Sequence, residues 1–318
     1  MGGLNLDLII NPLIVAGIGA VLAALITIID GVVNNYGDVQ IDINDGKETR
    51  NVKGGSPLLL TLSEQEIFIP SACGGRGTCG ACKLKVKSDI GPIYPTEKPF
   101  MSPEEEKENT RLSCQIKVKS DLKIEIPEEL FNVKQFDAAV KSIKDVTHDI
   151  KEIQFKLNNS EKINFQAGQY MQFEAPAYEK VKDATQRAYS ISSKPVDDDM
   201  VELLIRLVPG GIVTSYVFNY LKEGQKVRLI GPFGDFVVQE TGADMICVAG
   251  GSGMAPIKSI VYDMLQNAKT DRHVWYFFGA RCKRDLFYLD EFKEIEKQWR
   301  SEERRVGKEC RSRWSPYH

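Results

Sequence analysis

Four cysteines in the first half of the chain have a spacing that could bind iron. They follow the pattern C-x5-C-x2-C-x31-C: Cys73, Cys79, Cys82 and Cys114. The glycines among the first three supply the unusual φ values and close backbone approach that a tight loop needs: Gly74, Gly75, Gly77 and Gly80. Such a loop turns its N–H groups toward the anionic sulfurs, which stabilises them and raises the reduction potential.

Zinc and disulfides are the competing interpretations of these cysteines. A structural zinc site typically shows two C-x-x-C pairs, whereas this stretch has one pair and three cysteines in a single loop. Disulfides are disfavoured in a cytoplasmic compartment. The pattern therefore favours a [2Fe–2S] cluster. Cys247 and Cys282 lie outside the cluster pattern, and we interpret both as structural.

A second set of residues could bind a flavin. Arg187 offers a rigid fork for a pyrophosphate, and Tyr189 offers a flat face for an isoalloxazine ring. The Ser190 hydroxyl can reach the flavin N5 edge, which makes it the candidate catalytic residue. Gly211 and Thr214 begin a predicted helix whose N–H groups can bind phosphate. R-x-Y-S alone also fits an ordinary strand, but Arg187 lies 24 residues before this helix start, which favours FAD.

A third set of residues lies on a glycine turn between a strand and a helix. Residues 245–249 form a continuous apolar run of the kind buried in parallel sheets, and a helix through Leu265 follows the turn. Strand, glycine turn and helix N-terminus together favour a dinucleotide phosphate site. The candidate binding residues are Gly250, Gly251, Gly253, Met254, Ala255 and Pro256, with Arg281 after a second strand at 274–278.

Short strands and turns must hold these sets in place. Before the cysteines, the sequence predicts strands at 39–43 and 48–52 and a helical run from Leu58 capped by Ser56. A short acidic helix capped by Ser102 and a strand at 122–126 follow the cysteine loop. Alternating strands separated by turns then predict an antiparallel barrel: 138–146, 150–157, 170–173, 201–207 and 226–230.

The N-terminal segment reads as a membrane anchor. Residues 8–29 contain no charge, and 22 residues of helix span roughly 33 Å, enough for the hydrocarbon core of a bilayer. No Lys or Arg precedes the run and no cleavage site follows it, so a signal peptide is disfavoured. Basic residues begin at Lys47, which favours a single pass with the catalytic domains in the cytoplasm.

Composition and the C-terminal end set further bounds. The 318 residues carry a formal net charge of −3, so the chain has no excess of basic residues that would favour binding to nucleic acid. Residues 300–318 show no helical or strand period and resemble translated sequencing adapter, so we expect the natural chain to be cut near Trp299. Only two parallel strands, at about 245–249 and 274–278, are then expected, with an exposed apolar edge and poor oxidation of NADH.

These motifs resemble known families. Residues 39–127 resemble the β-grasp ferredoxin fold, with Cys114 as the final ligand. Four further motifs resemble the ferredoxin–NADP reductase superfamily: Arg187 to Ser190, Gly231 to Phe236, Gly250 to Pro256 and Gly279 to Arg281. The order of the parts resembles the NADH-oxidising F subunits of sodium-pumping NADH:quinone oxidoreductases. We therefore expect a multidomain α+β chain: transmembrane helix 8–29, ferredoxin domain 37–127, antiparallel FAD-binding β-barrel 135–235, incomplete α/β nucleotide-binding domain 240–299 and tail 300–318.

The resemblance implies an activity and its partners. The cofactors are FAD and a [2Fe–2S] cluster, NADH is the substrate, and electrons pass through other membrane subunits to quinone. The location is the bacterial inner membrane, with bilayer contact through residues 8–29. A Cys-Gly-Pro motif and a C-terminal aromatic residue of the family are missing, and the sequence does not decide between NADH and NADPH.

Two other function classes compete with this one. A stand-alone reductase that feeds an oxygenase shares every motif from Cys73 to Arg281, but soluble reductases of that kind lack a membrane helix. A membrane-anchored redox sensor leaves the flavin and nucleotide motifs unexplained. The apolar N-terminal run therefore favours the electron-input component of a membrane complex.

Overall fold

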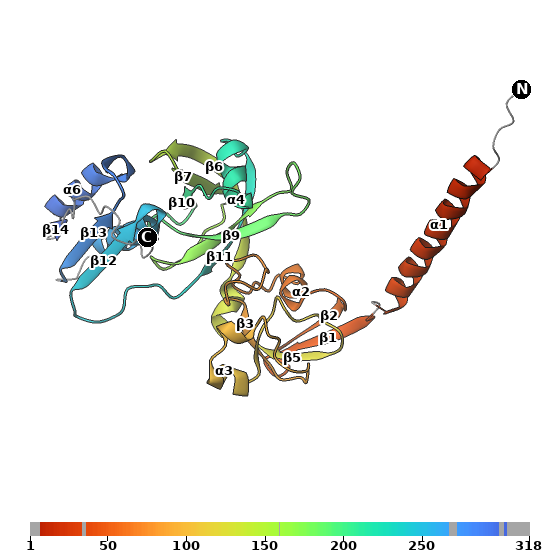
Figure 1. The fold of residues 1–318 in the computed structure, drawn as a ribbon. Coiled ribbons are helices and arrows are strands. Elements are labelled where there is room, and N and C mark those ends of the chain that lie inside the picture. Colours follow the sequence, from red (N-terminus) through yellow and green to blue (C-terminus); the bar gives the residue numbers. More distant parts are fainter. Residues whose placement is uncertain (1–6, 34–35, 159, 267–271, 299–301, 304–318) are drawn as a thin grey trace, which may run out of the picture. The chain divides into compact units, whose positions relative to one another are not determined.

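The computed structural model describes residues 7–33, 36–158, 160–266, 272–298 and 302–303 (Figure 1). The chain forms two compact units. The first unit contains Met1–Gln65 and Cys82–Ile126, and the second contains Glu66–Ala81 and Pro127–His318. The segment with the first two cysteines therefore belongs to the second unit.

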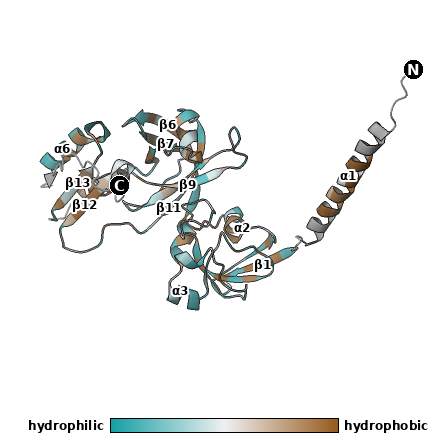
Figure 2. Cartoon of the chain, viewed as in Figure 1, coloured by the Kyte–Doolittle hydropathy of each residue, from teal (hydrophilic) through white to brown (hydrophobic). Residues whose placement is uncertain are grey.

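Helix α1 spans Asp7–Val33 and is the hydrophobic helix in Figure 2. Its described side chains, at residues 14–27, are exposed. The large apolar ones are Ile14, Val15, Ile18, Val21, Leu22, Leu25 and Ile26. In the part of the chain that is described, no helix reaches the combined length and apolarity needed to cross a bilayer. The helix itself is confirmed, and its role as a transmembrane segment stays a prediction.

The remainder of the first unit is a five-stranded sheet in the order β2-β1-β5-β3-β4. Its strands are β1 (Asp38–Ile43), β2 (Glu48–Lys53), β3 (Lys83–Val86), β4 (Thr110–Leu112) and β5 (Leu122–Glu125). Only the β1–β5 pair is parallel among the described pairs of this sheet. Alternate residues of β1 are buried, because successive side chains of a strand point to opposite faces. The strands expected at 39–43, 48–52 and 122–126 are confirmed.

Two helix N-caps were predicted in this unit, and the structure confirms one of them. Ser102 caps α3 (Pro103–Lys107), accepting the Glu105 N–H at 3.2 Å while Glu105 accepts the Ser102 N–H at 2.8 Å. At α2 (Leu58–Glu64) the predicted Ser56 cap is wrong, because Pro57 is the N-cap residue and makes no side-chain hydrogen bond. The Leu58 N–H instead donates to the Ile116 carbonyl at 2.7 Å, so tertiary pairing replaces the cap.

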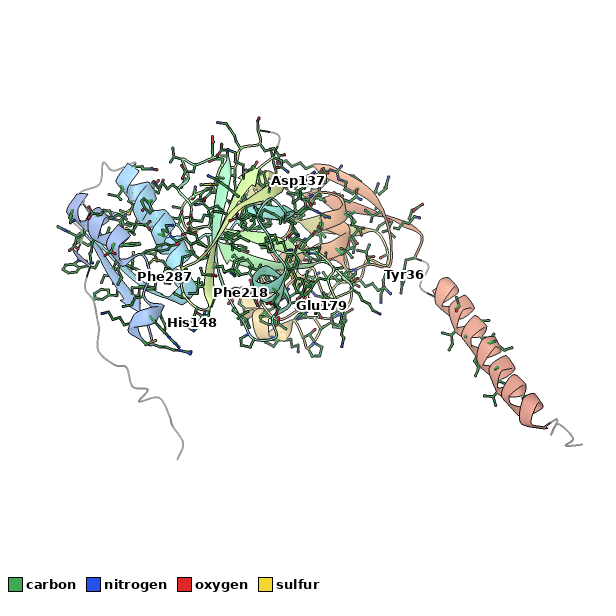
Figure 3. All side chains as sticks on the ribbon, turned by 90° about the horizontal axis from the view of Figure 1, so that it is seen from above. Tyr36, Asp137, His148, Glu179, Phe218 and Phe287 are labelled. Atoms are coloured by element: carbon green, nitrogen blue, oxygen red, sulfur yellow. The ribbon has the colours of Figure 1, made fainter. Side chains whose placement is uncertain are left out.

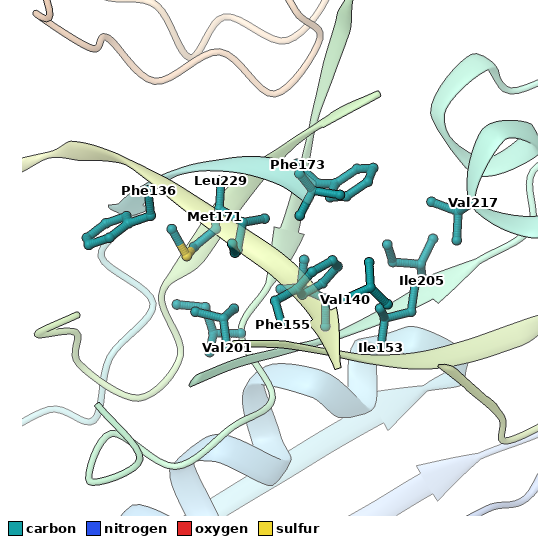
Figure 4. Packing of buried hydrophobic residues seen from close by; sticks show 14 of the residues in the cluster. Phe136, Val140, Ile153, Phe155, Met171, Phe173, Val201, Ile205, Val217 and Leu229 are labelled. Atoms are coloured by element: carbon teal, nitrogen blue, oxygen red, sulfur yellow. The ribbon is translucent and has the colours of Figure 1, made fainter. Parts of the chain in front are cut away.

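The second unit begins with a curled six-stranded antiparallel sheet in the order β10-β7-β6-β11-β8-β9. Its strands are β6 (Lys134–Asp145), β7 (Ile150–Leu157), β8 (Tyr170–Ala175), β9 (Thr185–Ser190), β10 (Met200–Arg206) and β11 (Lys226–Phe233), with α4 (Ile212–Asn219) beside them. A bridge between Ile191 and Leu203 joins the two edges of the sheet. The predicted antiparallel barrel is thus confirmed, and its interior is filled by apolar side chains such as Phe155 and Phe173 (Figure 4).

A parallel sheet follows in the same unit, in the order β12-β13-β14. Its strands are β12 (Met245–Gly250), β13 (Val274–Gly279) and β14 (Glu302–Glu303), and its helices are α5 (Met254–Gln266) and α6 (Leu289–Gln298). The expectation of only two parallel strands is wrong, since the open edge of β13 pairs with the backbone of β14. Phe287, labelled in Figure 3, packs edge-on against Phe278 with ring centroids 5.2 Å apart.

Short 3-10 helices connect these elements. They are η1 (Lys98–Phe100), η2 (Glu128–Asn132), η3 (Gly251–Gly253) and η4 (Lys283–Asp285). Of these, η2 lies between the predicted ferredoxin and flavin domains, and η3 forms the glycine turn before α5.

Candidate functional site

The cysteine loop has the glycine-dependent shape that the sequence predicts. All four loop glycines have left-handed φ values: Gly74 (66°), Gly75 (83°), Gly77 (70°) and Gly80 (68°). Residues with a Cβ rarely adopt this region, so the chain can make these turns only because glycine stands there. The loop is held from within by Ser71, whose hydroxyl accepts the Gly75 N–H at 2.9 Å.

The Cys73 thiol has surroundings suited to a thiolate ligand. Burial acts to raise its pKa, but hydrogen bonds from the Thr78 backbone, the Cys79 thiol, the Thr78 hydroxyl and the Arg76 backbone outweigh burial and lower it to about 7. The ordinary pKa of a cysteine thiol is about 8.5. Backbone N–H groups that face a sulfur favour the anionic form that binds iron.

Cys82 and Cys114 pair with each other in the first unit. The pKa of Cys82 is raised, chiefly by its hydrogen bond with the Cys114 side chain and then by burial. The structure thus brings Cys73 together with Cys79, and Cys82 together with Cys114, in different units. No group of three or more His, Cys, Asp or Glu side chains within the described residues is arranged to hold a metal ion. The four-cysteine ligand set stays a prediction.

Strand β9 carries the predicted R-x-Y-S residues and is antiparallel to β8. Arg187 Nη1 donates to the Gln186 carbonyl at 2.6 Å and to the Cys73 carbonyl at 2.9 Å. The Tyr189 ring is half-buried and packs on the barrel core, and burial raises its pKa. Ser190 is half-buried at the strand end, opposite Tyr170.

The predicted phosphate-binding helix start is a tightly closed turn. Gly211 is the N-cap residue of α4, and a Cβ there would lie 2.6 Å from Thr214 Oγ1 and 3.0 Å from the Val208 carbonyl oxygen. Thr214 is buried, and its hydroxyl accepts the Val208 N–H at 3.2 Å. The Thr214 side chain therefore stabilises the turn, which leaves backbone N–H groups as the groups able to bind a phosphate.

The glycine turn of the nucleotide site adopts the predicted strand-turn-helix order. Gly251 has a φ of 55°, and a Cβ at Gly250 would lie 3.3 Å from the Gly279 carbonyl oxygen. Met254 and Ala255 have buried side chains, and the Met254 sulfur accepts the Tyr276 hydroxyl at 3.0 Å. These two side chains belong to the core, so only their backbone can face a dinucleotide.

The other predicted nucleotide residues surround this turn without being buried. Gly253 is exposed and Pro256 is half-buried at the start of α5, and Arg281 is exposed after β13. Pro256 has no N–H to donate, so it can contribute only shape and a fixed φ.

The structure also contains a buried ion pair that the sequence analysis missed. Lys258 Nζ on α5 lies 2.7 Å from Glu202 Oε1 on β10 and 3.7 Å from Glu152 Oε2 on β7. Burial acts to raise the pKa of Glu202, but Lys258, with hydrogen bonds from Gln154 and Ser192, holds it below its ordinary value. The pair fixes the helix that follows the glycine turn to two strands of the barrel. The available signal in the sequence was a lysine within the apolar run that begins α5.

The flavin motif and the loop around Cys73 fit the expected cofactors, although no three cysteines converge within the described residues. Arg187 Nε and Nη2 have no hydrogen-bond partner among the described residues, so both can donate to an anion. The half-buried Tyr189 ring suits a flat ring, and the backbone at the start of α4 suits a phosphate. The inward N–H groups around Cys73 suit an iron–sulfur cluster.

Comparison with known families matches each part of the chain. The family described as 2Fe-2S iron-sulfur cluster binding domain matches residues 41–119. The Oxidoreductase FAD-binding domain family matches residues 137–238, and the Oxidoreductase NAD-binding domain family matches residues 247–314. The last match extends into the segment that resembles translated adapter.

Curated relatives resemble the chain over most of its length. The chain is 37% identical to the F subunit of the Na(+)-translocating NADH-quinone reductase of Marinomonas sp. (strain MWYL1), over 92% of this chain and 80% of that protein. The F subunit of the same enzyme from Neisseria gonorrhoeae is 36% identical over 91% of this chain and 80% of its own.

Solved structures share the fold. The Amycolatopsis cytochrome P450 reductase GcoB superposes with a TM-score of 0.65 and 27% identity, covering 84% of this chain and 80% of that one. The ferredoxin reductase in carbazole 1,9a-dioxygenase gives 0.62 and 26%, covering 87% and 82%.

Proposed function

Because this chain belongs to the family of F subunits of Na(+)-translocating NADH-quinone reductases, we propose that it brings electrons from NADH into a quinone-reducing membrane complex. FAD, when bound, supplies the conversion from two-electron hydride transfer to single-electron transfer that iron requires. The observation that carries the proposal is the loop contact within the second unit: Arg187 of the flavin motif hydrogen-bonds the Cys73 carbonyl. This contact supports a short path from the proposed flavin to the first proposed cluster ligand.

The residues of the barrel hold and orient the flavin in this proposal. Arg187 Nε and Nη2 and the backbone N–H groups that follow Gly211 at the start of α4 bind the pyrophosphate, and Tyr189 lies against the ring. The Ser190 hydroxyl is the catalytic group, placed to hydrogen-bond the N5 edge that receives hydride. The glycine turn from Gly250 binds the phosphates of NADH, and Arg281 contributes a charge at the end of the next strand.

The cysteines hold the cluster in this proposal. Cys73, Cys79, Cys82 and Cys114 are its four ligands. The domain boundaries are 37–127 for the ferredoxin part, 135–235 for the flavin part and 240–299 for the nucleotide part. Support comes from the inward N–H groups at Cys73 and from the family match over residues 41–119.

Helix α1 anchors the protein in the bacterial inner membrane in this proposal, as a single pass through residues 8–29 with the catalytic domains in the cytoplasm. The support is the uncharged sequence and the exposure of the apolar side chains described on this helix, residues 14–27. The partners are the other membrane subunits of the complex, in line with the name of the relatives.

A reductase that feeds an oxygenase is the second candidate. The solved reductases that superpose on 84–87% of the chain favour it, since one is a cytochrome P450 reductase and the other serves a dioxygenase. The apolar sequence of residues 8–29 favours the first candidate. Co-purification with membrane subunits supports the first, and co-purification with an oxygenase supports the second.

The test is the cofactor content and redox behaviour of the detergent-purified chain. We expect bound FAD, a paramagnetic iron–sulfur signal after reduction with dithionite, and bleaching of the flavin absorbance by NADH. Cys73→Ser is expected to abolish the paramagnetic signal and to keep the flavin, whereas Cys247→Ser, which changes a buried thiol outside the ligand set, is expected to keep both. Purified protein without flavin and without the signal would overturn the proposal.

A further inference from the structure

The cysteine loop is attached to the barrel and not to the sheet that precedes and follows it in sequence. Residues 66–81 belong to the second unit, although the chain on both sides, up to Gln65 and from Cys82, belongs to the first. An excursion of this kind needs contacts of its own to hold it. Two contacts within the second unit supply them, one apolar and one polar.

The apolar contact is made by Phe68, near the start of the loop segment. Its buried ring packs in a small cluster of barrel and linker residues: Val133, Ile230 and Phe233, with Leu130 and Tyr170 at the margin. Burial of a phenylalanine side chain stabilises by roughly 1.5–3 kcal/mol. This contact holds one end of the loop against β11.

The polar contact is made by Arg187 on β9. Its Nη1 donates to the Cys73 carbonyl at 2.9 Å, across a sequence separation of 114 residues. A hydrogen bond from a charged donor is stronger than a neutral one. The contact therefore joins the peptide of a predicted cluster ligand directly to the strand that carries the flavin motif.

Gly74 permits this contact by lacking a side chain. A Cβ at this position would lie 2.7 Å from Arg187 Nη1 and 2.9 Å from the Gln186 carbonyl oxygen. Both distances are shorter than any normal packing distance of a Cβ, so the loop backbone lies directly against β9. The φ of Gly74, 66°, also favours glycine.

The guanidinium has enough donors for two partners. Nη1 binds the loop, while Nε and Nη2 have no partner within the described residues. An arginine has five N–H donors in a rigid plane, so it can hold the loop with one nitrogen and an anion with the others.

From this geometry we propose that Arg187 is a positioning residue for electron transfer. It fastens the cysteine loop to strand β9 through its hydrogen bond to the Cys73 carbonyl, and Gly74 allows this close approach because it has no side chain. The inference rests on the proposed function and deepens it. Its consequence is that the loop and the flavin-binding strand move as one body, so the separation between the flavin and the first two cluster ligands is fixed within the second unit.

The test measures amide hydrogen exchange in residues 66–81 of the purified, cofactor-loaded chain by mass spectrometry. Gly74→Ala inserts a Cβ between the loop and β9. Gly224→Ala is the matched control, since Gly224 has a similar φ of 79° and open space around it. Arg187→Lys keeps the charge but lacks the planar fork of donors that lets a guanidinium reach the loop and an anion in different directions.

Loss of a charge-assisted hydrogen bond is expected to speed exchange in the loop roughly 10- to 100-fold in Gly74→Ala and in Arg187→Lys. Gly224→Ala is expected to match the unsubstituted chain. In the Gly74→Ala molecules that retain FAD and iron, reduction of the cluster after flavin reduction is also expected to slow.

The outcomes separate the inference from the proposed function. An unsubstituted chain without FAD or iron would overturn the proposed function. A chain with both cofactors, whose loop exchange is the same in Gly74→Ala, Arg187→Lys and Gly224→Ala, would overturn the inference alone. If Arg187→Lys loses its flavin, the loop exchange of Gly74→Ala decides between the outcomes, since that substitution replaces no residue of the flavin motif.

Discussion

Arg111 and Glu97 form an ion pair in the first unit whose side chains are both 0% exposed. Arg111 Nη2 lies 2.8 Å from Glu97 Oε2, and Glu97 Oε1 also accepts the Leu112 N–H at 2.9 Å. Removing one partner of a buried pair leaves an uncompensated charge, which costs about 3–5 kcal/mol. We expect Arg111→Met to lower the free energy of unfolding of this unit by that amount, measured by urea denaturation followed by circular dichroism.

The control for this prediction is an exposed ion pair in the same unit. Lys85 and Glu108 lie 2.8 Å apart with side chains 44% and 56% exposed. Exposed pairs contribute little, because water screens them and ordering the side chains costs entropy. Lys85→Met is therefore expected to leave the urea midpoint unchanged. A drop as large as that of Arg111→Met would contradict the role of burial.

Glu202 is expected to make the second unit less stable as the pH is lowered. Burial acts to raise its pKa in the folded state, but the Lys258 ammonium group outweighs burial and lowers it. A carboxyl of this kind stabilises the fold above its unfolded pKa of about 4.3, and the stabilisation is lost as the pH falls through the folded value. We expect the thermal midpoint of this unit to fall steadily when the pH is lowered below about 5.

In Lys258→Met, the contribution of Glu202 to stability is expected to change with pH in the opposite direction. Without the ammonium group, burial dominates and raises the pKa of Glu202, so protonation then favours the folded state. The variant is expected to be less stable at neutral pH and to recover part of the difference on acidification. Calorimetric scans at several pH values test this, and parallel pH profiles for the two proteins would refute it.

At the scale of elements, sequence patterns predicted the strands that have one buried face. Strand β1 alternates exposed and buried residues, as its Val and Ile spacing indicates. The six residues of β9 are all half-buried, so no alternation marks that strand. Strand β14 consists of two glutamates that pair with β13, and two charged residues carry no alternating apolar pattern that would predict a strand.

Some features of the candidate site could be predicted from the local sequence, and others could not. Glycines with positive φ in the cysteine loop follow from local backbone sterics, so the sequence predicts them. The Arg187–Cys73 contact joins residues 114 positions apart, and the partners of Lys258 come from two barrel strands and α6. Such pairs depend on tertiary packing, which no local spacing encodes.

Strand β12 supports a prediction about self-association. Ile246 and Val248 point to one face of the parallel sheet and are 73% and 72% exposed, while Cys247 and Ala249 are buried on the other face. Exposed apolar sheet faces promote association. We expect Ile246→Lys with Val248→Thr to reduce aggregation in light scattering without lowering the thermal midpoint.

The buried face of the same strand provides the control. Ala249→Lys places a charge at a position that is 8% exposed, so it is expected to unfold the nucleotide part and to increase aggregation. If the exposed-face double variant aggregates as much as the unsubstituted chain, this face does not drive association.

For the molecule as a whole, the chain crosses between its two units at the cysteine loop. It leaves the first unit after Gln65, places Cys73 and Cys79 on the barrel, and returns at Cys82. Residues close in sequence are thereby shared between two folded bodies. Loss of the barrel fold is expected to release the cysteine loop as well, so the order of the first two proposed cluster ligands depends on the flavin part.

The exposed apolar side chains of helix α1 predict that the molecule resides in a membrane. Ile18 and Leu22 lie one turn apart on α1, and both are exposed within a strongly hydrophobic helix (Figure 2). A lysine near the centre of a membrane helix costs about 2.5–3.5 kcal/mol. We expect Ile18→Lys with Leu22→Lys to move the chain from the carbonate-washed membrane pellet to the supernatant. Val196→Lys, at an exposed apolar position of the second unit, is the control and is expected to leave the chain in the pellet. An unsubstituted chain found in the supernatant would contradict the anchor, because no other described segment offers an exposed apolar run of this length.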